Sequence, residues 1–235
     1  MNKEKLLDCK IITPKNKAKF SIIWLHGLGA SNDDFLPVAP LLRLDDLDIR
    51  FIFPQAPEQA VTINMGYVMP AWYDIRRLDA NDTDFGRDVD ENGIINSIQR
   101  IEALIAQEQH AGVPSERIFL VGFSQGGALA LATALQSKQS LAGIIALSAY
   151  LAAGDQLLAR FNAVNSQTPI FMAHGLQDTV VAYKFGCRSR DYLQQRGHPL
   201  DWHAYPMAHE VCPEEINDMA TWLRQQCDNM KASAS

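Results

Sequence analysis

Residues 118–132 read Ile-Phe-Leu-Val-Gly-Phe-Ser-Gln-Gly-Gly-Ala-Leu-Ala-Leu-Ala. A short apolar run rich in β-branched and aromatic residues is followed directly by helix formers, which predicts a strand, a sharp turn and a helix. Ser124 stands at the turn, within the pattern G-x-S-x-G. Because Gly122 and Gly126 lack side chains, the backbone can close tightly and expose the serine. The strand before and the helix after favour a nucleophilic serine over a merely structural glycine turn.

The rest of the chain alternates predicted strands with predicted helices, which indicates a mainly parallel sheet covered by helices on both faces. Its 235 residues and 47% apolar composition fit a single α/β domain over residues 1–235. In such sheets, functional residues lie at the carboxyl ends of the strands. Beyond the central stretch, we predict strands at residues 6–12, 20–25, 49–53, 143–148, 169–174 and 200–205, and helices at residues 32–44, 88–110, 155–162, 180–196 and 213–229.

The net charge, the apolar stretches and the cysteine spacing exclude several classes of protein. The formal net charge is −6 and no lysine or arginine cluster occurs, which argues against nucleic acid or an anionic membrane surface as the main partner. The N-terminus has no apolar run of signal-peptide length, and the longest mostly apolar stretch, residues 141–153, is too short and too broken to span a bilayer. The cysteines are scattered without C-x-x-C spacing, so we expect neither a zinc site nor a disulfide framework but reduced thiols in the cytoplasm. They are Cys9, Cys187, Cys212 and Cys227.

A serine hydroxyl is a poor nucleophile near neutral pH, so Ser124 requires a base and a group that orients the base. In a G-x-S-x-G sheet the acid follows the serine along the chain and the histidine comes last, each after a later strand. Of the acids ahead of the last strand, only Asp178 directly follows a predicted buried strand; the others are Asp155 and Asp191. Asp178 is therefore the predicted acid.

Three histidines follow Asp178. His198 precedes the last predicted strand, His203 lies inside it, and His209 comes just after it. The position of His209 predicts the catalytic base, and the other two are interpreted as a turn residue and a strand residue. His26 and His174 also end strands, but they precede the acid, so we interpret them as groups that support or pack the loops.

A metal site is the alternative use of histidines and acids. No H-E-x-x-H pattern occurs, because His209-Glu210 is followed by Val-Cys-Pro, and no metal is expected. Residues 79–91 briefly resemble a calcium loop. Asp84 occupies the position that requires glycine, and Asp90 occupies that of the bidentate glutamate. We interpret this stretch as a solvated loop whose acids favour the start of the next helix.

Residues 54–77 form a long apolar and aromatic excursion between predicted elements. Alternation on both sides of Asn64-Met65-Gly66 predicts a hairpin. Such an apolar loop either lines a hydrophobic groove or packs against the core, and the sequence leaves both open.

Together with Ser124, Asp178 and His209, the motifs His26-Gly-Leu-Gly and Ala71-Trp-Tyr-Asp-Ile make the chain resemble a known family. It resembles the acyl-protein thioesterases and small carboxylesterases (lysophospholipase-like) of the α/β-hydrolase fold, from Phe20 to about Leu223. The form Val61-Thr-Ile-Asn-x-Gly-Tyr is most similar to the bacterial carboxylesterase branch.

The resemblance implies an enzyme that cleaves carboxylic esters or thioesters without a cofactor. It assigns Ser124, Asp178 and His209 to the triad, and the N–H groups of Leu28 and Gln125 to the oxyanion hole. It also implies an acyl groove with an aromatic wall at a position where eukaryotic members commonly have tryptophan. The groove residues it assigns are Ile63, Met65, Val68 and Met69, and the wall is Tyr150.

Some members of the family form homodimers, so a homodimer is open here. Residues 150–168 are too few for a large helical cap, and we expect an open site. Two other functions stay open at this point: a peptidase or amidase on the same scaffold, and a non-catalytic binding protein that keeps the fold.

Overall fold

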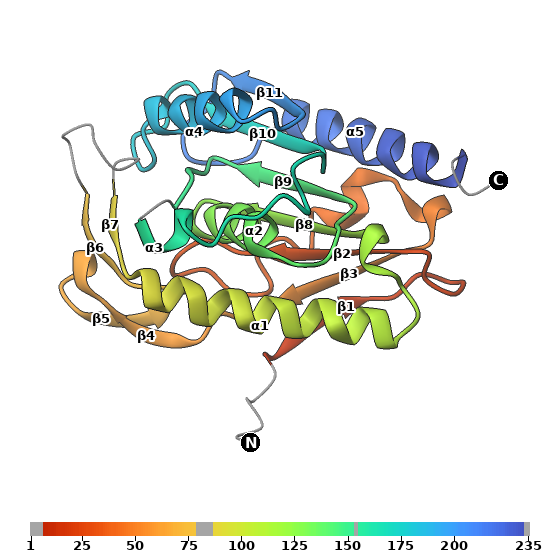
Figure 1. Cartoon of the computed structure of the whole chain (residues 1–235), viewed down its shortest axis with the longest axis horizontal. Coiled ribbons are helices and arrows are strands. Elements are labelled where there is room, and N and C mark those ends of the chain that lie inside the picture. The colour runs from red at the N-terminus through yellow and green to blue at the C-terminus, as the bar shows by residue number, and fades with distance from the viewer. Residues whose placement is uncertain (1–6, 79–86, 153–154, 233–235) are drawn as a thin grey trace.

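The computed structural model describes residues 7–78, 87–152 and 155–232, and its centre is a seven-stranded sheet (Figure 1). The strand order is β1-β3-β2-β8-β9-β10-β11. Only β1 runs antiparallel to its neighbour, and every other pair in this sheet is parallel. The strands are β1 (Cys9–Ile12), β2 (Phe20–Leu25), β3 (Ile49–Pro54), β8 (Ile118–Phe123), β9 (Gly143–Leu147), β10 (Ile170–Gly175) and β11 (Leu200–Tyr205).

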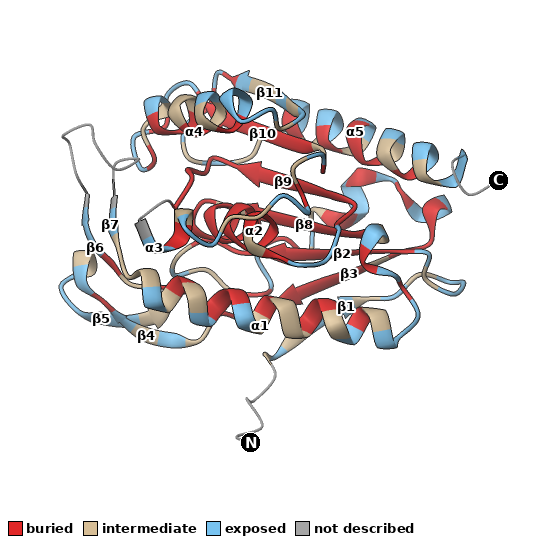
Figure 2. Cartoon of the chain, in the orientation of Figure 1, coloured by how far each residue is buried: buried red, intermediate tan, exposed pale blue. Residues whose placement is uncertain are grey.

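Helices cover both faces of this sheet, which confirms the predicted α/β-hydrolase architecture. Strand β2 shows the consequence, because all six of its residues are buried. Ile23 packs in one core cluster with α1, α2 and α4, whereas Trp24 packs in the other with α5. Figure 2 shows the same pattern of buried central strands between half-exposed helices. The helices are α1 (Glu91–His110), α2 (Gln125–Gln136), α3 (Asp155–Leu158), α4 (Tyr183–Gln195) and α5 (Pro213–Ala232).

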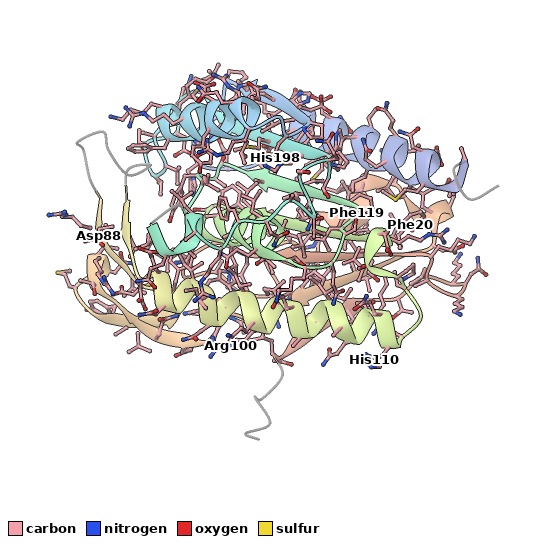
Figure 3. The ribbon with its side chains drawn as sticks, in the orientation of Figure 1. Phe20, Asp88, Arg100, His110, Phe119 and His198 are labelled. Atoms are coloured by element: carbon pink, nitrogen blue, oxygen red, sulfur yellow. The ribbon has the colours of Figure 1, made fainter. Side chains whose placement is uncertain are left out.

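Helix α1 illustrates how the hydrophobic period places these layers. Its buried apolar residues recur at helical spacing and face the sheet, as predicted. Arg100 and His110 project from its outer side, away from the sheet (Figure 3). Phe20 and Phe119, also labelled there, bring their ring centroids to 6.4 Å where β2 and β8 adjoin.

Several predicted helices differ from the observed elements. The helix predicted at residues 155–162 is only the four-residue α3, which ends at Leu158. The helix predicted at 32–44 is wrong: turns and a short 3₁₀ helix, η1 (Ala39–Leu42), replace it. Pro37 and Pro40 lack the backbone N–H groups that a continuous α-helix requires. The helix predicted from residue 88 begins at Glu91, because β7 (Arg87–Val89) pairs with β6 (Ile75–Leu78) ahead of it. The helix predicted from residue 180 begins at Tyr183.

The predicted hairpin in residues 54–77 is confirmed. β4 (Glu58–Val61) pairs antiparallel with β5 (Tyr67–Pro70), and the short 3₁₀ helix η3 (Thr62–Asn64) opens the turn between them. This hairpin and the antiparallel pair β6–β7 lie at the carboxyl ends of the parallel strands (Figure 1). Of the acidic stretch 79–91, residues 79–86 lie outside the described part of the chain.

Within residues 150–168, the described residues include a single helix, the four-residue α3. No described helix is long and apolar enough to cross a membrane.

Candidate active site

Ser124 lies at the turn between β8 and α2 in a strained backbone conformation, with φ 54° and ψ −118°. Its N–H donates to the Leu147 carbonyl at 2.8 Å, which ties the turn to β9. A Cβ added to Gly122 would lie 2.3 Å from the Gly126 carbonyl carbon, and one added to Gly126 would lie 2.3 Å from the Leu25 oxygen. The G-x-S-x-G pattern therefore has a steric cause, because only glycine fits at these two positions.

Asp178 and His209 approach each other from the loops that follow β10 and β11. The His209 Nδ1 lies 2.7 Å from the Asp178 Oδ2. The two loops are joined through their backbones, since the Gln177 N–H donates to the Met207 carbonyl at 3.0 Å. A Cβ on Gly175 would come within 2.2 Å of the Ala208 oxygen, so the loops approach as closely as glycine permits.

The carboxylate of Asp178 is fully buried and well supplied with donors. Its Oδ1 accepts from the N–H groups of Val180 at 2.9 Å and Val181 at 2.8 Å. Burial alone would raise the pKa of Asp178, but hydrogen bonds from His174 and His209 outweigh it and hold that pKa well below its usual value. Asp178 is therefore an anion held against the His209 ring.

Ser124 and His209 line the same cleft, whose volume is about 480 Å³. The Phe123 ring packs on His209, with centroids 4.7 Å apart. The fold thus brings together the serine, acid and histidine that lie 85 positions apart in sequence from first to last. The lining residues of the cleft are Gly27, Leu28, Ala30, Asp34, Ile63, Asn64, Ile75, Phe123, Ser124, Gln125, Tyr150, Thr179, Val180 and His209.

Both residues expected to form the oxyanion hole, Leu28 and Gln125, line this cleft. Gln125 is the first residue of α2, where backbone N–H groups have no partner within the helix and the helix dipole favours negative charge. The Gln125 side chain is 1% exposed and, unlike its backbone N–H, is engaged in hydrogen bonds to a neighbouring segment. It accepts from the Trp72 N–H at 2.9 Å and donates to the Tyr73 carbonyl at 2.8 Å.

His26 holds the loop that carries Leu28. Its Nε2 accepts from the Ala56 N–H at 3.1 Å, so the ring proton is on Nδ1, which donates to the Gly27 carbonyl at 2.7 Å. Burial lowers the pKa of His26, although the Gly27 carbonyl opposes this effect. The neutral ring therefore fits the loop, in keeping with the supporting role that the sequence indicated.

The residues expected to form the acyl groove separate into two groups. Ile63 and Tyr150 line the cleft, whereas Met65, Val68 and Met69 are not among its lining residues. Met65 is 88% exposed and Val68 is 63% exposed. Ile63 lies in η3, which contributes two lining residues, whereas Val68 and Met69 lie on β5, which contributes none.

Sequence reasoning did not single out several lining residues, among them Phe123, Asn64, Thr179 and Val180. A local signal existed for two of these positions, because Phe123 adjoins the predicted nucleophile and Thr179 adjoins the predicted acid. The position of Asn64 depends on how the hairpin folds over the sheet.

Comparison with known proteins agrees with this geometry. The family model described as Phospholipase/Carboxylesterase matches residues 7–227. The chain belongs to the phospholipase/carboxylesterase family. Within this family, it is 40% identical over 210 residues to acyl-protein thioesterase 1 of Yarrowia lipolytica, covering 87% of this chain and 91% of that protein.

Solved structures show the same likeness. The crystal structure of SOBER1 from Arabidopsis thaliana superposes with a TM-score of 0.82 at 30% identity, covering 89% of this chain and 99% of that one. Acyl-protein thioesterase 2 from Zea mays gives a TM-score of 0.75 at 26% identity, covering 94% and 99%. This phospholipase/carboxylesterase family member therefore shares the fold of both over nearly their whole length.

Proposed function

We propose that this family member is a serine hydrolase that cleaves carboxylic esters or thioesters with an apolar acyl chain. The observation that carries the proposal is the common cleft of Ser124 and His209, together with the bond from His209 to the buried Asp178. The name of the Yarrowia lipolytica relative supports an acyl thioester as substrate.

The proposed mechanism follows from the direction of these hydrogen bonds. Since Nδ1 of His209 donates to Asp178, its Nε2 carries a lone pair and takes the proton of the Ser124 hydroxyl. The serine oxygen attacks the carbonyl carbon, and the N–H groups of Leu28 and Gln125 stabilise the oxyanion. His209 then protonates the leaving alcohol or thiol, and water cleaves the acyl-enzyme by the same steps.

The composition of the cleft supports the apolar acyl chain. Ile63, Ile75, Phe123 and Val180 contribute apolar side chains around the serine, and the Tyr150 ring adds an aromatic one. Such a lining favours a hydrocarbon chain over a charged group. The proposal also includes a cytoplasmic location, which the four free cysteines support.

Ser124→Ala tests the proposal. If the triad acts as a unit, kcat should fall by about 10⁶, whereas the exposed Ser140→Ala control should keep full activity. Full esterase activity in Ser124→Ala would refute the assignment. A fluorophosphonate should label Ser124 in the folded wild type, and an unlabelled protein would instead favour a non-catalytic binding protein.

Substrate panels separate the remaining alternatives. Esters and thioesters of graded acyl length should define the preferred chain and leaving group. Faster turnover of aminoacyl amides than of p-nitrophenyl esters would favour the peptidase or amidase function instead.

A further inference from the structure

A second histidine lies beside the carboxylate of Asp178. His174, near the end of β10, is completely buried. Its Nε2 lies 2.7 Å from the Val181 carbonyl oxygen and 3.4 Å from the Asp178 Oδ2. It is thus placed against the same oxygen that accepts from His209.

The surroundings of His174 indicate which ring nitrogen carries a proton. A carbonyl oxygen only accepts, so the Nε2 that faces Val181 carries a proton. The Nδ1 is buried and has no hydrogen-bond partner among the described residues. An N–H there would be buried unsatisfied, which is costly. The geometry therefore places a ring proton of His174 on Nε2.

Packing holds this proton in place. The Trp202 ring stacks on His174 with centroids 6.4 Å apart, and the Tyr183 ring meets it edge-on at 5.9 Å. On the remaining side, a Cβ on Gly186 would come within 2.4 Å of the His174 Nδ1. The imidazole consequently has little freedom to turn its Nε2 away from Asp178.

From this geometry, and given the proposed function, we infer that His174 is a positioning residue for the catalytic acid. Its Nε2–H, shared between the Val181 carbonyl and the Asp178 Oδ2, fixes the carboxylate plane toward His209. It also withdraws part of the negative charge that His209 experiences.

The second effect has a definite sign. A donor at Oδ2 weakens the attraction between the carboxylate and a proton on the His209 ring. Removing that donor should raise the pH at which His209 loses its proton. The shift should be about 0.5 to 1 pH unit, because only the shared contact at 3.4 Å is lost and the three hydrogen bonds from Val180, Val181 and His209 remain.

Other titratable groups near these rings stay unchanged in the test. Tyr183 of α4 faces His174, and Arg190 of the same helix stacks on the Trp202 ring at 5.0 Å. On the side of His209, Asp34 lines the cleft and Glu210 is the next residue in the chain.

His174→Phe removes the donor and keeps a planar ring. We measure the pH profile of kcat/KM on a p-nitrophenyl ester and expect its acid limb to move to higher pH by about 0.5 to 1 pH unit. His174→Gln can place its amide N–H near the position of Nε2 and should restore the wild-type limb. A matched control is His203→Phe on β11, whose ring stacks on Phe171 in the other core cluster and should leave the profile unchanged.

A direct titration of the His209 imidazole by NMR of histidine-labelled protein provides a readout independent of turnover. An unchanged His209 midpoint in folded His174→Phe would show that His174 only fills space, and would overturn the inference. If His174→Phe does not fold, His174→Asn is titrated instead, since its shorter amide does not reach Oδ2, and the same two outcomes apply. An inactive wild type with unlabelled Ser124 would refute the proposed function, whereas the NMR midpoints still test the role of His174.

Discussion

The Gln125 side chain should contribute strongly to stability although its backbone belongs to the catalytic turn. The side chain is 1% exposed and links the start of α2 to the Trp72-Tyr73 segment through two hydrogen bonds, of 2.9 and 2.8 Å. Gln125→Leu keeps a similar volume but leaves the Trp72 N–H and the Tyr73 carbonyl without these partners. The substitution therefore changes mainly the hydrogen bonding of two buried backbone groups.

The magnitude follows from the two groups left unsatisfied. Each buried backbone donor or acceptor that loses its partner costs about 1–3 kcal/mol, so Gln125→Leu should lower the free energy of unfolding by about 2–6 kcal/mol. The backbone N–H of residue 125 remains in place. Turnover by the folded variant should accordingly fall far less than in Ser124→Ala.

Urea denaturation of wild type and variant, analysed by linear extrapolation, measures this difference. The control is Gln195→Leu, at the exposed end of α4, which should stay within about 0.5 kcal/mol of wild type. A loss of less than about 1 kcal/mol in Gln125→Leu, with an unchanged m-value, would refute the reasoning.

Three further predictions concern the turn, a buried acid and the open cleft. Gly126→Ala should abolish native folding or activity, because its Cβ would lie 2.3 Å from the Leu25 oxygen; native circular dichroism with full activity would contradict this. Burial raises the pKa of Glu215 from 4.5 to about 8, so the folded state keeps a proton that the unfolded chain has released. The contribution of this protonated carboxyl to the free energy of unfolding is fully present below pH 4.5 and is lost as the pH rises through 8. The Tm of Glu215→Gln relative to that of wild type should therefore be higher at pH 8.5 than at pH 5. An equal Tm difference at the two pH values would count against this prediction. Finally, hydrolysis should rise smoothly through the critical micelle concentration of an ester substrate, and a sharp jump in rate there would argue against an open site.

The strand, turn and helix around Ser124 were predictable because their causes are local. Gly122 is required by contacts within the turn, and the apolar run before it and the helix formers after it are adjacent in sequence. The contact that requires Gly126 is with Leu25 of β2 and exists only in the folded sheet. The predicted roles of Asp178 and His209 needed the chain order of a G-x-S-x-G sheet and the rule that parallel strands end at one edge of a sheet. The hairpin at residues 58–70 was likewise predictable from its turn residues.

Tertiary structure alone decided which side chains meet. Periodicity records that a residue is buried but not against which neighbour, so the sequence did not separate Ile63, which lines the cleft, from Met65 and Val68, which are exposed. The same holds for the Gln125 side chain, whose partners lie more than fifty positions away. His174 could be recognised as a strand-end histidine from sequence, and its contact with Asp178 is local, but the Tyr183 and Trp202 rings that pack on it come from α4 and β11. The sequence by itself thus determined the elements and the order of the reactive residues, and packing between distant segments determined their partners.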